Sequence, residues 1–397
     1  EKSDFHLKDG ERVVFYGDSI TDQRLYTTFV ETYVVTRFPS RNVRFVHSGW
    51  GGDRVSGGGG VPVDVRLRRD VFAHKPTVMT VMLGMNDASY RKFDEGVFEK
   101  YRAGYEHIVA SVRENLPDVR LTLIRPSPYD DVTRAIKIEG GYNNVLVRFG
   151  QFVDELAKRE RLAPVADLNG PVVAALEKAK AANPELSQKI VPDYVHPAAS
   201  GHLLMASELL KTWRAPAIVT AVEIDAGARK VTRSENSKVT RLEANNGLIW
   251  TQADSALPMP VDMGDPVMAL AVHSSDFVSS LNQQPLRVTG LKDGSYSLRI
   301  DGTEVGKFAN KELVEGVNLA LLPTPMFKQA QDVHKLTLQH NDIHFVRWRQ
   351  VQLRATNADV QALQGALDAL DSLEDDLIKK QRKAAQPMER KYELVPL

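Results

Sequence analysis

One stretch decides the predicted fold: Val13-Val14-Phe15-Tyr16-Gly17-Asp18-Ser19-Ile20-Thr21. Four strand-forming residues lead into Gly-Asp-Ser, and apolar residues then recur at helical spacing as far as Phe38. This order predicts a buried strand, a tight turn that carries Ser19, and a helix behind the turn. Ligands bind at the carboxyl edge of an open α/β sheet, so Ser19 is the first candidate functional residue.

Three further stretches place glycine or polar residues where predicted elements end. A strand over 43–46 runs into Gly49-Trp50-Gly51-Gly52-Asp53, and an apolar strand over 78–83 ends at Gly84-Met85-Asn86-Asp87. The last stretch is a stiff loop held by its flanking prolines, Asp193-Tyr194-Val195-His196-Pro197. Strands alternate with helical patterns throughout this half of the chain, which predicts a parallel sheet covered by helices on both faces.

These four stretches resemble the four blocks of the GDSL, or SGNH, hydrolase family, which carry Ser, Gly, Asn and His in that order. The resemblance covers about residues 10–215. It implies an α/β fold of the SGNH type, a flavodoxin-like parallel sheet sandwiched by helices, in a catalytic domain over 1–215. It also implies a serine esterase that needs no cofactor and no metal. The chain has no Gly-x-Ser-x-Gly elbow, which argues against the α/β-hydrolase fold.

The resemblance and the chemistry of serine hydrolases assign a role to each block. A serine hydroxyl is a weak nucleophile unless a base takes its proton, so Ser19 needs His196 as general base. Asp193 would accept a hydrogen bond from the other ring nitrogen and fix the tautomer of the histidine. The resemblance assigns the oxyanion donors to the backbone amides of Ser19 and Gly52 and to the side chain of Asn86.

Each of these residues also has a purely structural interpretation. Ser19 could simply cap the helix that follows it, and Asn86 could be an ordinary turn residue at a strand end. Asp193 and His196 could face water in a surface loop. The ordered set of four stretches favours the catalytic interpretation. His47 departs from the family, which often has asparagine at this point, so we expect different hydrogen bonding in the glycine loop.

Less specific features surround these blocks. Asp18, Trp50 and Tyr90 are candidates for substrate binding, since the two rings could stack on a sugar or an aromatic ring, although ordinary packing would explain them equally well. The run Gly57-Gly58-Gly59-Gly60 lacks the Lys and Ser/Thr of a phosphate-binding loop, so we expect a flexible rim of the site. Histidine spacings of six and four do not suit a metal site, and packing or surface roles are expected for His334, His340 and His344.

The composition excludes several classes of protein. Lys plus Arg and Asp plus Glu both number 51, so the net charge is zero and gives no general attraction to nucleic acid or to an anionic membrane. The absence of cysteine excludes disulfides, thiolate metal sites and a cysteine nucleophile. No apolar run reaches the roughly 18–20 residues of a membrane span. Because the chain begins with Glu1 rather than Met, we expect an exported protein, secreted or periplasmic, whose signal peptide has been removed.

The sequence changes character near Pro216. Alternating and turn-forming patterns predict a small β-rich domain over 216–324, and a helical extension follows over 325–397. The extension carries one apolar stripe, which consists of Val360, Leu363, Leu367, Leu370 and Leu377. Such a stripe docks onto the body of the protein or onto a second subunit, so a homo-oligomer formed through the C-terminal helices is the candidate protein partner.

Within the family, an exported chain with extra domains best fits removal of acetyl groups from a plant or microbial polysaccharide. The ligand expected is therefore a small-molecule or polysaccharide ester. Two enzymatic alternatives stay open: a general short-chain lipase or arylesterase, and acyl transfer to a sugar in place of water. A third alternative, from another class, is a carbohydrate-binding or assembly scaffold without catalysis.

Overall fold

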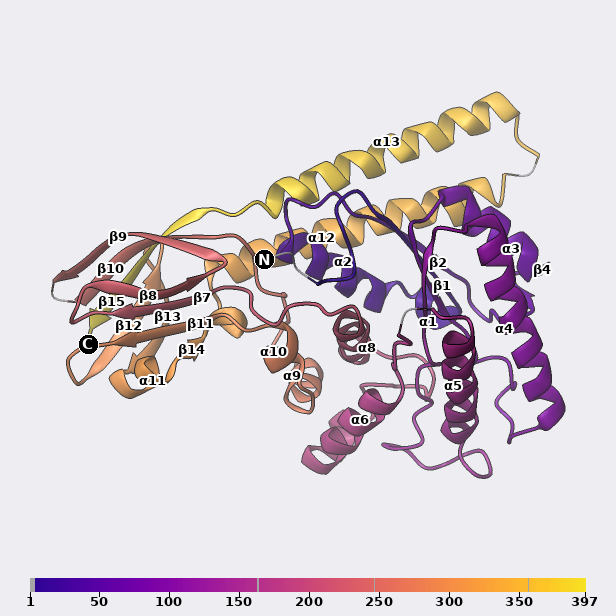
Figure 1. Ribbon diagram of the computed structural model, residues 1–397, viewed down its shortest axis with the longest axis horizontal. Helices are drawn as coiled ribbons and strands as arrows, with labels where there is room; N and C mark the ends of the chain where they lie inside the picture. Colours follow the sequence, from indigo (N-terminus) through magenta and orange to yellow (C-terminus); the bar gives the residue numbers. More distant parts are fainter. Residues whose placement is uncertain (1–3, 163, 246, 356) are drawn as a thin grey trace. The chain divides into compact units, whose positions relative to one another are not determined.

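The computed structural model describes residues 4–162, 164–245, 247–355 and 357–397 (Figure 1). The chain forms two compact units. Unit 1 comprises Glu1–Glu31, Asn42–Ala215 and Asp262–Asp276, and unit 2 comprises Thr32–Arg41, Pro216–Val261 and Phe277–Leu397. The division into three domains at 1–215, 216–324 and 325–397 stays a prediction.

Unit 1 is built on a parallel sheet with the strand order β2-β1-β5-β6. Its strands are β1 (Arg12–Gly17), β2 (Arg44–Gly49), β5 (Val78–Met82) and β6 (Arg120–Leu123). All of β5 and all but the first residue of β1 are buried, because a sheet covered by helices on both faces favours apolar side chains at every position. The predicted α/β fold with a parallel sheet is thereby confirmed.

Helices alternate with the strands of this sheet as far as β6, as predicted, and further helices of the chain follow β6. They are α1 (Ser19–Asp22), α2 (Leu25–Arg37), α3 (Val63–Asp70), α4 (Glu95–Asn115), α5 (Tyr142–Arg159), α6 (Gly170–Ala182), α7 (Pro184–Ser187), α8 (Ala199–Thr212) and α9 (Pro266–His273). In helix α4, Asp94 caps the first turn by accepting a hydrogen bond from the Val97 amide, and the apolar residues at helical spacing are buried.

The glycine run at 57–60 differs from the sequence prediction of a flexible loop outside any element. Strands β3 (Gly57–Gly58) and β4 (Val61–Pro62) form a short antiparallel pair there. A Cβ atom on Gly58 would lie 1.5 Å from Asp53 Oδ1, and one on Gly59 would lie 2.3 Å from the Trp50 ring. Glycine is therefore needed for close packing against the neighbouring loop rather than for flexibility.

Unit 2 contains two sheets, in the strand orders β14-β11-β7-β8 and β13-β12-β15-β10-β9. One hydrophobic core takes residues from both sheets, among them Ile224, Trp250, Val288, Leu298 and Tyr392. This confirms the predicted β-rich region. The strands are β7 (Ala221–Asp225), β8 (Lys230–Glu235), β9 (Ser237–Asn245), β10 (Gly247–Asp254), β11 (Pro285–Thr289), β12 (Ser295–Ile300), β13 (Thr303–Ala309), β14 (Val317–Asn318) and β15 (Glu389–Pro396).

The predicted helical extension over 325–397 is present in most of its length, but its last segment, Glu389–Pro396, forms strand β15, because alternate residues such as Tyr392 and Leu394 are buried in the core of the sheet. Two short helices, α10 (Phe277–Leu281) and α11 (Asn310–Glu315), precede the long helices α12 (Pro325–Phe345) and α13 (Val360–Ala384), which pack side by side (Figure 1). Within the apolar stripe of α13, Leu367 is buried, whereas Val360 is 81% exposed. Burial disfavours the charge of Glu374 on α13. The Nδ1 atoms of His340 and His344 on α12 lie 3.7 and 3.4 Å from its carboxylate oxygens, and these contacts outweigh burial and lower the pKa of Glu374 to about 2.

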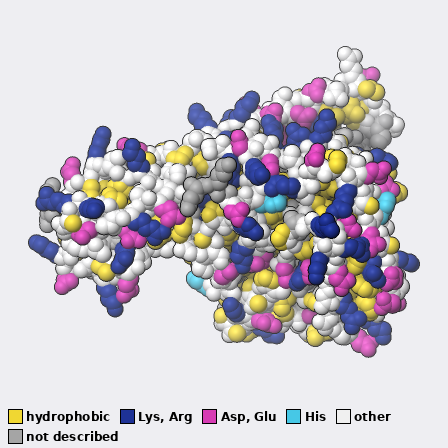
Figure 2. All heavy atoms as spheres, in the orientation of Figure 1, with side chains coloured by type: hydrophobic (Ala, Val, Ile, Leu, Met, Phe, Trp, Pro, Cys, Tyr) yellow, Lys and Arg dark blue, Asp and Glu magenta, His cyan; other side chains and the backbone are white. Residues whose placement is uncertain are grey.

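Two surface features complete the description. On the face shown in Figure 2, basic and acidic side chains are interspersed, as expected for a chain with equal numbers of both. No helix in the described part of the chain combines the length and the hydropathy that crossing a bilayer requires.

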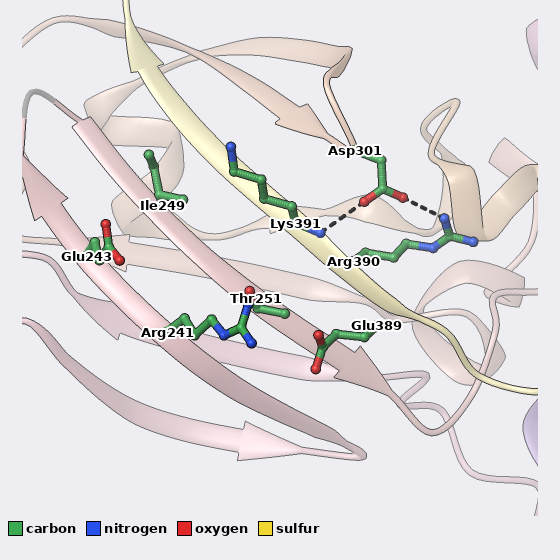
Figure 3. A pocket seen from close by; sticks show the side chains of 8 residues that line it. All are labelled: Arg241, Glu243, Ile249, Thr251, Asp301, Glu389, Arg390 and Lys391. Carbon is green, nitrogen blue, oxygen red and sulfur yellow. Dashed lines mark hydrogen bonds and ion pairs between the residues drawn. The ribbon is translucent and has the colours of Figure 1, made fainter.

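The sheet that contains β15 carries a pocket of about 500 Å³ (Figure 3). Asp301 lies at its edge, where it accepts hydrogen bonds from the Lys391 amide at 2.9 Å and from the Arg390 guanidinium at 2.7 Å. None of the described lining residues is aromatic, so the pocket offers no ring on which a sugar could stack. They are Arg241, Glu243, Ile249, Thr251, Asp301, Glu389, Arg390 and Lys391.

Candidate active site

Ser19 lies at the predicted turn, where β1 ends and α1 begins. A Cβ on Gly17 would lie 2.3 Å from Thr21 Oγ1 and 2.7 Å from the Met82 carbonyl oxygen, so the tight turn requires glycine. The residue that caps α1 is Asp18, whose Oδ1 accepts a hydrogen bond from the Ile20 amide at 3.0 Å. Since Asp18 provides the cap, the Ser19 hydroxyl is left for another contact.

That contact is with His196. The Ser19 Oγ lies 2.8 Å from His196 Nε2, and His196 Nδ1 lies 2.7 Å from Asp193 Oδ2. Partial burial disfavours the charge of Asp193, but hydrogen bonds from the backbone and side chain of His196 and from the Val195 amide outweigh it and lower its pKa. An ionised Asp193 keeps a proton on Nδ1, which leaves the Nε2 lone pair directed at the serine hydroxyl.

Hydrogen bonds connect the loop that carries His196, and helix α8 behind it, to the segment that joins α1 and α2 and to the first turn of α2. The buried His202 on α8 accepts a hydrogen bond from the Tyr26 amide at Nδ1, and its Nε2 lies 3.0 Å from Gln23 Oε1. Gln23 in turn donates to the Pro197 carbonyl at 3.5 Å. Burial lowers the pKa of His202 to about 3, so the ring is neutral and can accept at one nitrogen while it donates at the other.

The predicted oxyanion donors come from loops that follow three adjacent strands. Ser19 follows β1, Gly52 follows β2 and Asn86 follows β5. Gly52 has φ +78° in a turn that the Asp53 amide closes by donating to the Trp50 carbonyl at 3.0 Å. Asn86 Nδ2 donates to the Asp53 carbonyl at 3.0 Å, so one N–H bond of this amide is fixed and the second is left for a ligand.

Comparison with known proteins identifies the same part of the chain. Residues 15–204 match the GDSL-like lipase/acylhydrolase family. This part of the chain is a GDSL hydrolase domain. The match supports ester hydrolysis as the activity of this domain.

Two relatives are similar to the GDSL domain or to the whole chain. An acetylxylan esterase from Geobacillus stearothermophilus is 25% identical over 233 residues, which cover 52% of this chain and 94% of that protein. A gut microbial diltiazem-metabolizing enzyme of known structure is 27% identical with a TM-score of 0.86, and the match covers 99% of this chain and 100% of that one. The architecture of both units therefore recurs in a solved structure.

The crystal structure of an acetylxylan esterase from Geobacillus stearothermophilus has 21% identity and a TM-score of 0.42 over 52% of this chain and 96% of that one.

A buried charge network supports the glycine loop of the GDSL domain. Arg66 on α3 is fully buried and donates from Nε and Nη2 to Asp53 Oδ2 at 3.0 and 2.9 Å, and from Nη2 to the Ser48 carbonyl at 2.8 Å. It also pairs with Asp70 one helical turn further along α3. The sequence interpretation missed this network, although an acid four residues after Arg66 was a signal for an ion pair within a helix.

The three weaker substrate-binding candidates lie in different surroundings. Asp18 is only 2% exposed, which leaves it almost no surface for a substrate. Trp50 contacts the guanidinium groups of Arg66 and Arg69, 5.2 and 5.4 Å from its ring centre. Tyr90 is 38% exposed. Substrate contacts of Trp50 and Tyr90 stay predictions.

Asp18 makes the stability of the GDSL domain depend on pH. Burial raises the pKa of Asp18 to about 7, above its ordinary value of 3.8, and the nearby carboxylates of Asp87 and Asp53 add to the shift. Because the folded state binds this proton more tightly than the unfolded state, the contribution of Asp18 to stability is present at pH 4 and is lost as the pH rises through 7. We expect Asp18→Asn to flatten the fall in stability over this range by up to about 1.4 kcal/mol per pH unit.

Chemical unfolding of both proteins from pH 4 to pH 8 measures this effect. Asn at position 18 can still accept the Ile20 amide, so the helix cap is kept. Asp94→Asn is the matched control, because Asp94 is an exposed N-cap on α4. Equal pH slopes for wild type and Asp18→Asn would contradict the prediction.

Proposed function

We propose that this ester hydrolase removes acetyl groups from a carbohydrate through an acyl-enzyme formed on Ser19. The observation that carries the mechanism is the continuous hydrogen-bonded path from Ser19 Oγ to His196 Nε2 at 2.8 Å and from His196 Nδ1 to Asp193 at 2.7 Å. The acetyl group and the carbohydrate are supported by the 25% identity to an acetylxylan esterase.

In the first half-reaction, His196 Nε2 takes the proton of Ser19 as Oγ attacks the ester carbonyl carbon. The negative charge that develops on the carbonyl oxygen is held by the amides of Ser19 and Gly52 and by Asn86 Nδ2. Asp193 stays ionised and stabilises the imidazolium. His196 then gives the proton to the departing sugar oxygen, which leaves an acetyl group on Ser19.

In the second half-reaction, a water molecule takes the place of the sugar hydroxyl. His196 accepts a proton from this water as its oxygen attacks the acetyl carbonyl, and the same donors hold the oxyanion. Collapse of the intermediate breaks the bond to Ser19 Oγ, which recovers its proton from His196. Acetate leaves, and the enzyme returns to its starting state.

A second candidate function is general hydrolysis of short-chain or aryl esters in small molecules. The observation that favours it is the similarity over the whole chain to a gut microbial diltiazem-metabolizing enzyme. The two functions differ in what the site accepts as the alcohol half of the ester, and the triad chemistry is the same for both.

A substrate series separates the candidates. We expect kcat/KM on p-nitrophenyl esters to fall at least about tenfold from acetate to octanoate, because a pocket shaped for acetyl rejects added methylenes by this amount or more. Acetate release from acetylated xylan should accompany it. Hydrolysis of long-chain esters with acetylated xylan untouched would overturn the proposal in favour of a lipase, and turnover of diltiazem alone would favour the second candidate.

Two further outcomes address the remaining alternatives. Binding of xylan without any release of acetate would support the scaffold interpretation. Formation of a new ester when a competing alcohol is added would support acyl transfer, and product analysis of the same reactions detects it.

A further inference from the structure

Tyr90 lies in an unusual backbone conformation next to the proposed oxyanion site. Ser89 and Tyr90 have φ values of +50° and +56°, in the left-handed region that side chains larger than glycine disfavour. The turn is closed by hydrogen bonds from the Ser89 amide to the Asn86 carbonyl at 3.0 Å and from the Arg91 amide to the Ala88 carbonyl at 3.1 Å. A strained backbone of this kind persists only where surrounding contacts hold it. We therefore expect the side chain of Tyr90 to make a contact that stabilises this conformation.

The side chain makes a specific contact. The Tyr90 hydroxyl donates to Asn86 Oδ1 at 2.9 Å, while Asn86 Nδ2 donates to the Asp53 carbonyl at 3.0 Å. Both ends of the Asn86 amide are therefore bonded. If the amide were flipped, its oxygen would face the Asp53 carbonyl, and two acceptors would repel each other.

These contacts leave one N–H bond of Asn86 for the oxyanion. A donor on Oδ1 draws electron density from the amide and strengthens its N–H groups as donors, since hydrogen bonds in a chain polarise one another. The effect is largest in the transition state, where negative charge develops on the substrate, and stabilisation of the transition state raises kcat.

The Tyr90 ring is itself supported. It lies 5.2 Å from the Tyr142 ring and 6.3 Å from the Tyr129 ring, and the Tyr142 hydroxyl donates to the Met85 carbonyl at 2.7 Å. Burial, together with the charges of Asp18 and Asp193, raises the pKa of Tyr90 to about 12, so its hydroxyl keeps the proton that it donates.

We propose that Tyr90 is a positioning residue that fixes and polarises the Asn86 amide as an oxyanion donor. The inference rests on the proposed function through the role of Asn86. In this proposal Tyr90 acts on catalysis through Asn86. The sequence interpretation had suggested direct contact of Tyr90 with the substrate instead.

A double-mutant cycle of Tyr90→Phe and Asn86→Ala on p-nitrophenyl acetate tests the inference. We expect Tyr90→Phe to lower kcat about tenfold with KM changed less than about twofold, because one hydrogen bond to the reacting system is lost. In the Asn86→Ala background, the same substitution should change kcat by less than about twofold, since the residue it acts on is gone.

Tyr105→Phe is the matched control. It removes a buried hydroxyl that donates to the Val81 carbonyl at 3.0 Å, and we expect kcat within about twofold of wild type. Equal losses from Tyr90→Phe in both backgrounds, a change in KM alone, or no loss at all would overturn the inference.

Ser19→Ala is assayed beside the cycle to separate the two proposals. If Ser19→Ala loses activity and Tyr90→Phe does not, only the positioning role fails. If Ser19→Ala retains activity, the acyl-enzyme mechanism fails and the role of Tyr90 fails with it.

Discussion

Ser19→Ala should lower kcat/KM for p-nitrophenyl acetate by at least about a thousandfold, because the substitution removes the hydroxyl that forms the acyl-enzyme. The Ser19 hydroxyl lies 2.8 Å from His196 Nε2, and His196 is held by Asp193 at 2.7 Å, so the nucleophile and its base lie within hydrogen-bonding distance. The residual rate of the variant reports what substrate binding and the oxyanion donors achieve alone.

Steady-state kinetics of the two purified proteins measure the effect, and thermal unfolding provides the first control. The loss should occur with the melting temperature changed by no more than a few degrees, because Asp18 and not Ser19 caps α1. Ser111→Ala on α4 is a second control and should keep wild-type activity. If Ser19→Ala hydrolyses the ester as fast as wild type, Ser19 is not the nucleophile and the scaffold interpretation becomes the better one.

The features of the site that sequence could predict are local ones. The passage from strand to turn to helix around Ser19 is encoded within a few residues, and a parallel sheet brings the ends of neighbouring strands to one edge. His196 is 177 residues from Ser19, and its partnership was inferred from family resemblance and not from the residues between them.

Other features of the site depend on backbone conformations and packing that cannot be predicted from residue types. Ser89 and Tyr90 adopt left-handed backbone angles although neither is glycine or asparagine, so the contact of Tyr90 with Asn86 could not be derived from their spacing. The glycines at 57–60 looked like a flexible segment because their packing against Asp53 and Trp50 depends on a neighbouring loop.

The second unit shows the same limit over longer distances. Alternating residues predicted strands, but no local pattern could show that β15 at the end of the chain lies between β10 and β12. Its alternation of buried Tyr392 and Leu394 with more exposed neighbours was a signal for a strand within the region interpreted as helical. Pairing between distant strands is determined by packing of the whole unit, which a single sequence does not display.

The network around Arg66 leads to the largest expected effect on stability. Arg66 is fully buried and pairs with Asp53 and Asp70, whose side chains are also fully buried. Arg66→Met would leave Asp53 without its cation and Asp70 with Arg69 alone, and removing one partner of a buried ion pair costs about 3–5 kcal/mol. We expect a loss of this size in the free energy of unfolding, measured by urea denaturation at pH 8.

Arg69→Met is the matched control, because Arg69 also bonds Asp70 but its side chain is 25% exposed and lies next to solvent. Its replacement should cost less than about 1 kcal/mol.

Burial raises the pKa of Asp53 to about 6 in the presence of Arg66, and loss of the cation would raise it further. At pH 5 this carboxyl is then protonated in the variant, and neutralising it removes part of the penalty of burying a charge. The loss caused by Arg66→Met should therefore be smaller at pH 5 than at pH 8, whereas a loss that is equal at both pH values would indicate that Arg66 stabilises the domain through packing and not through its charge.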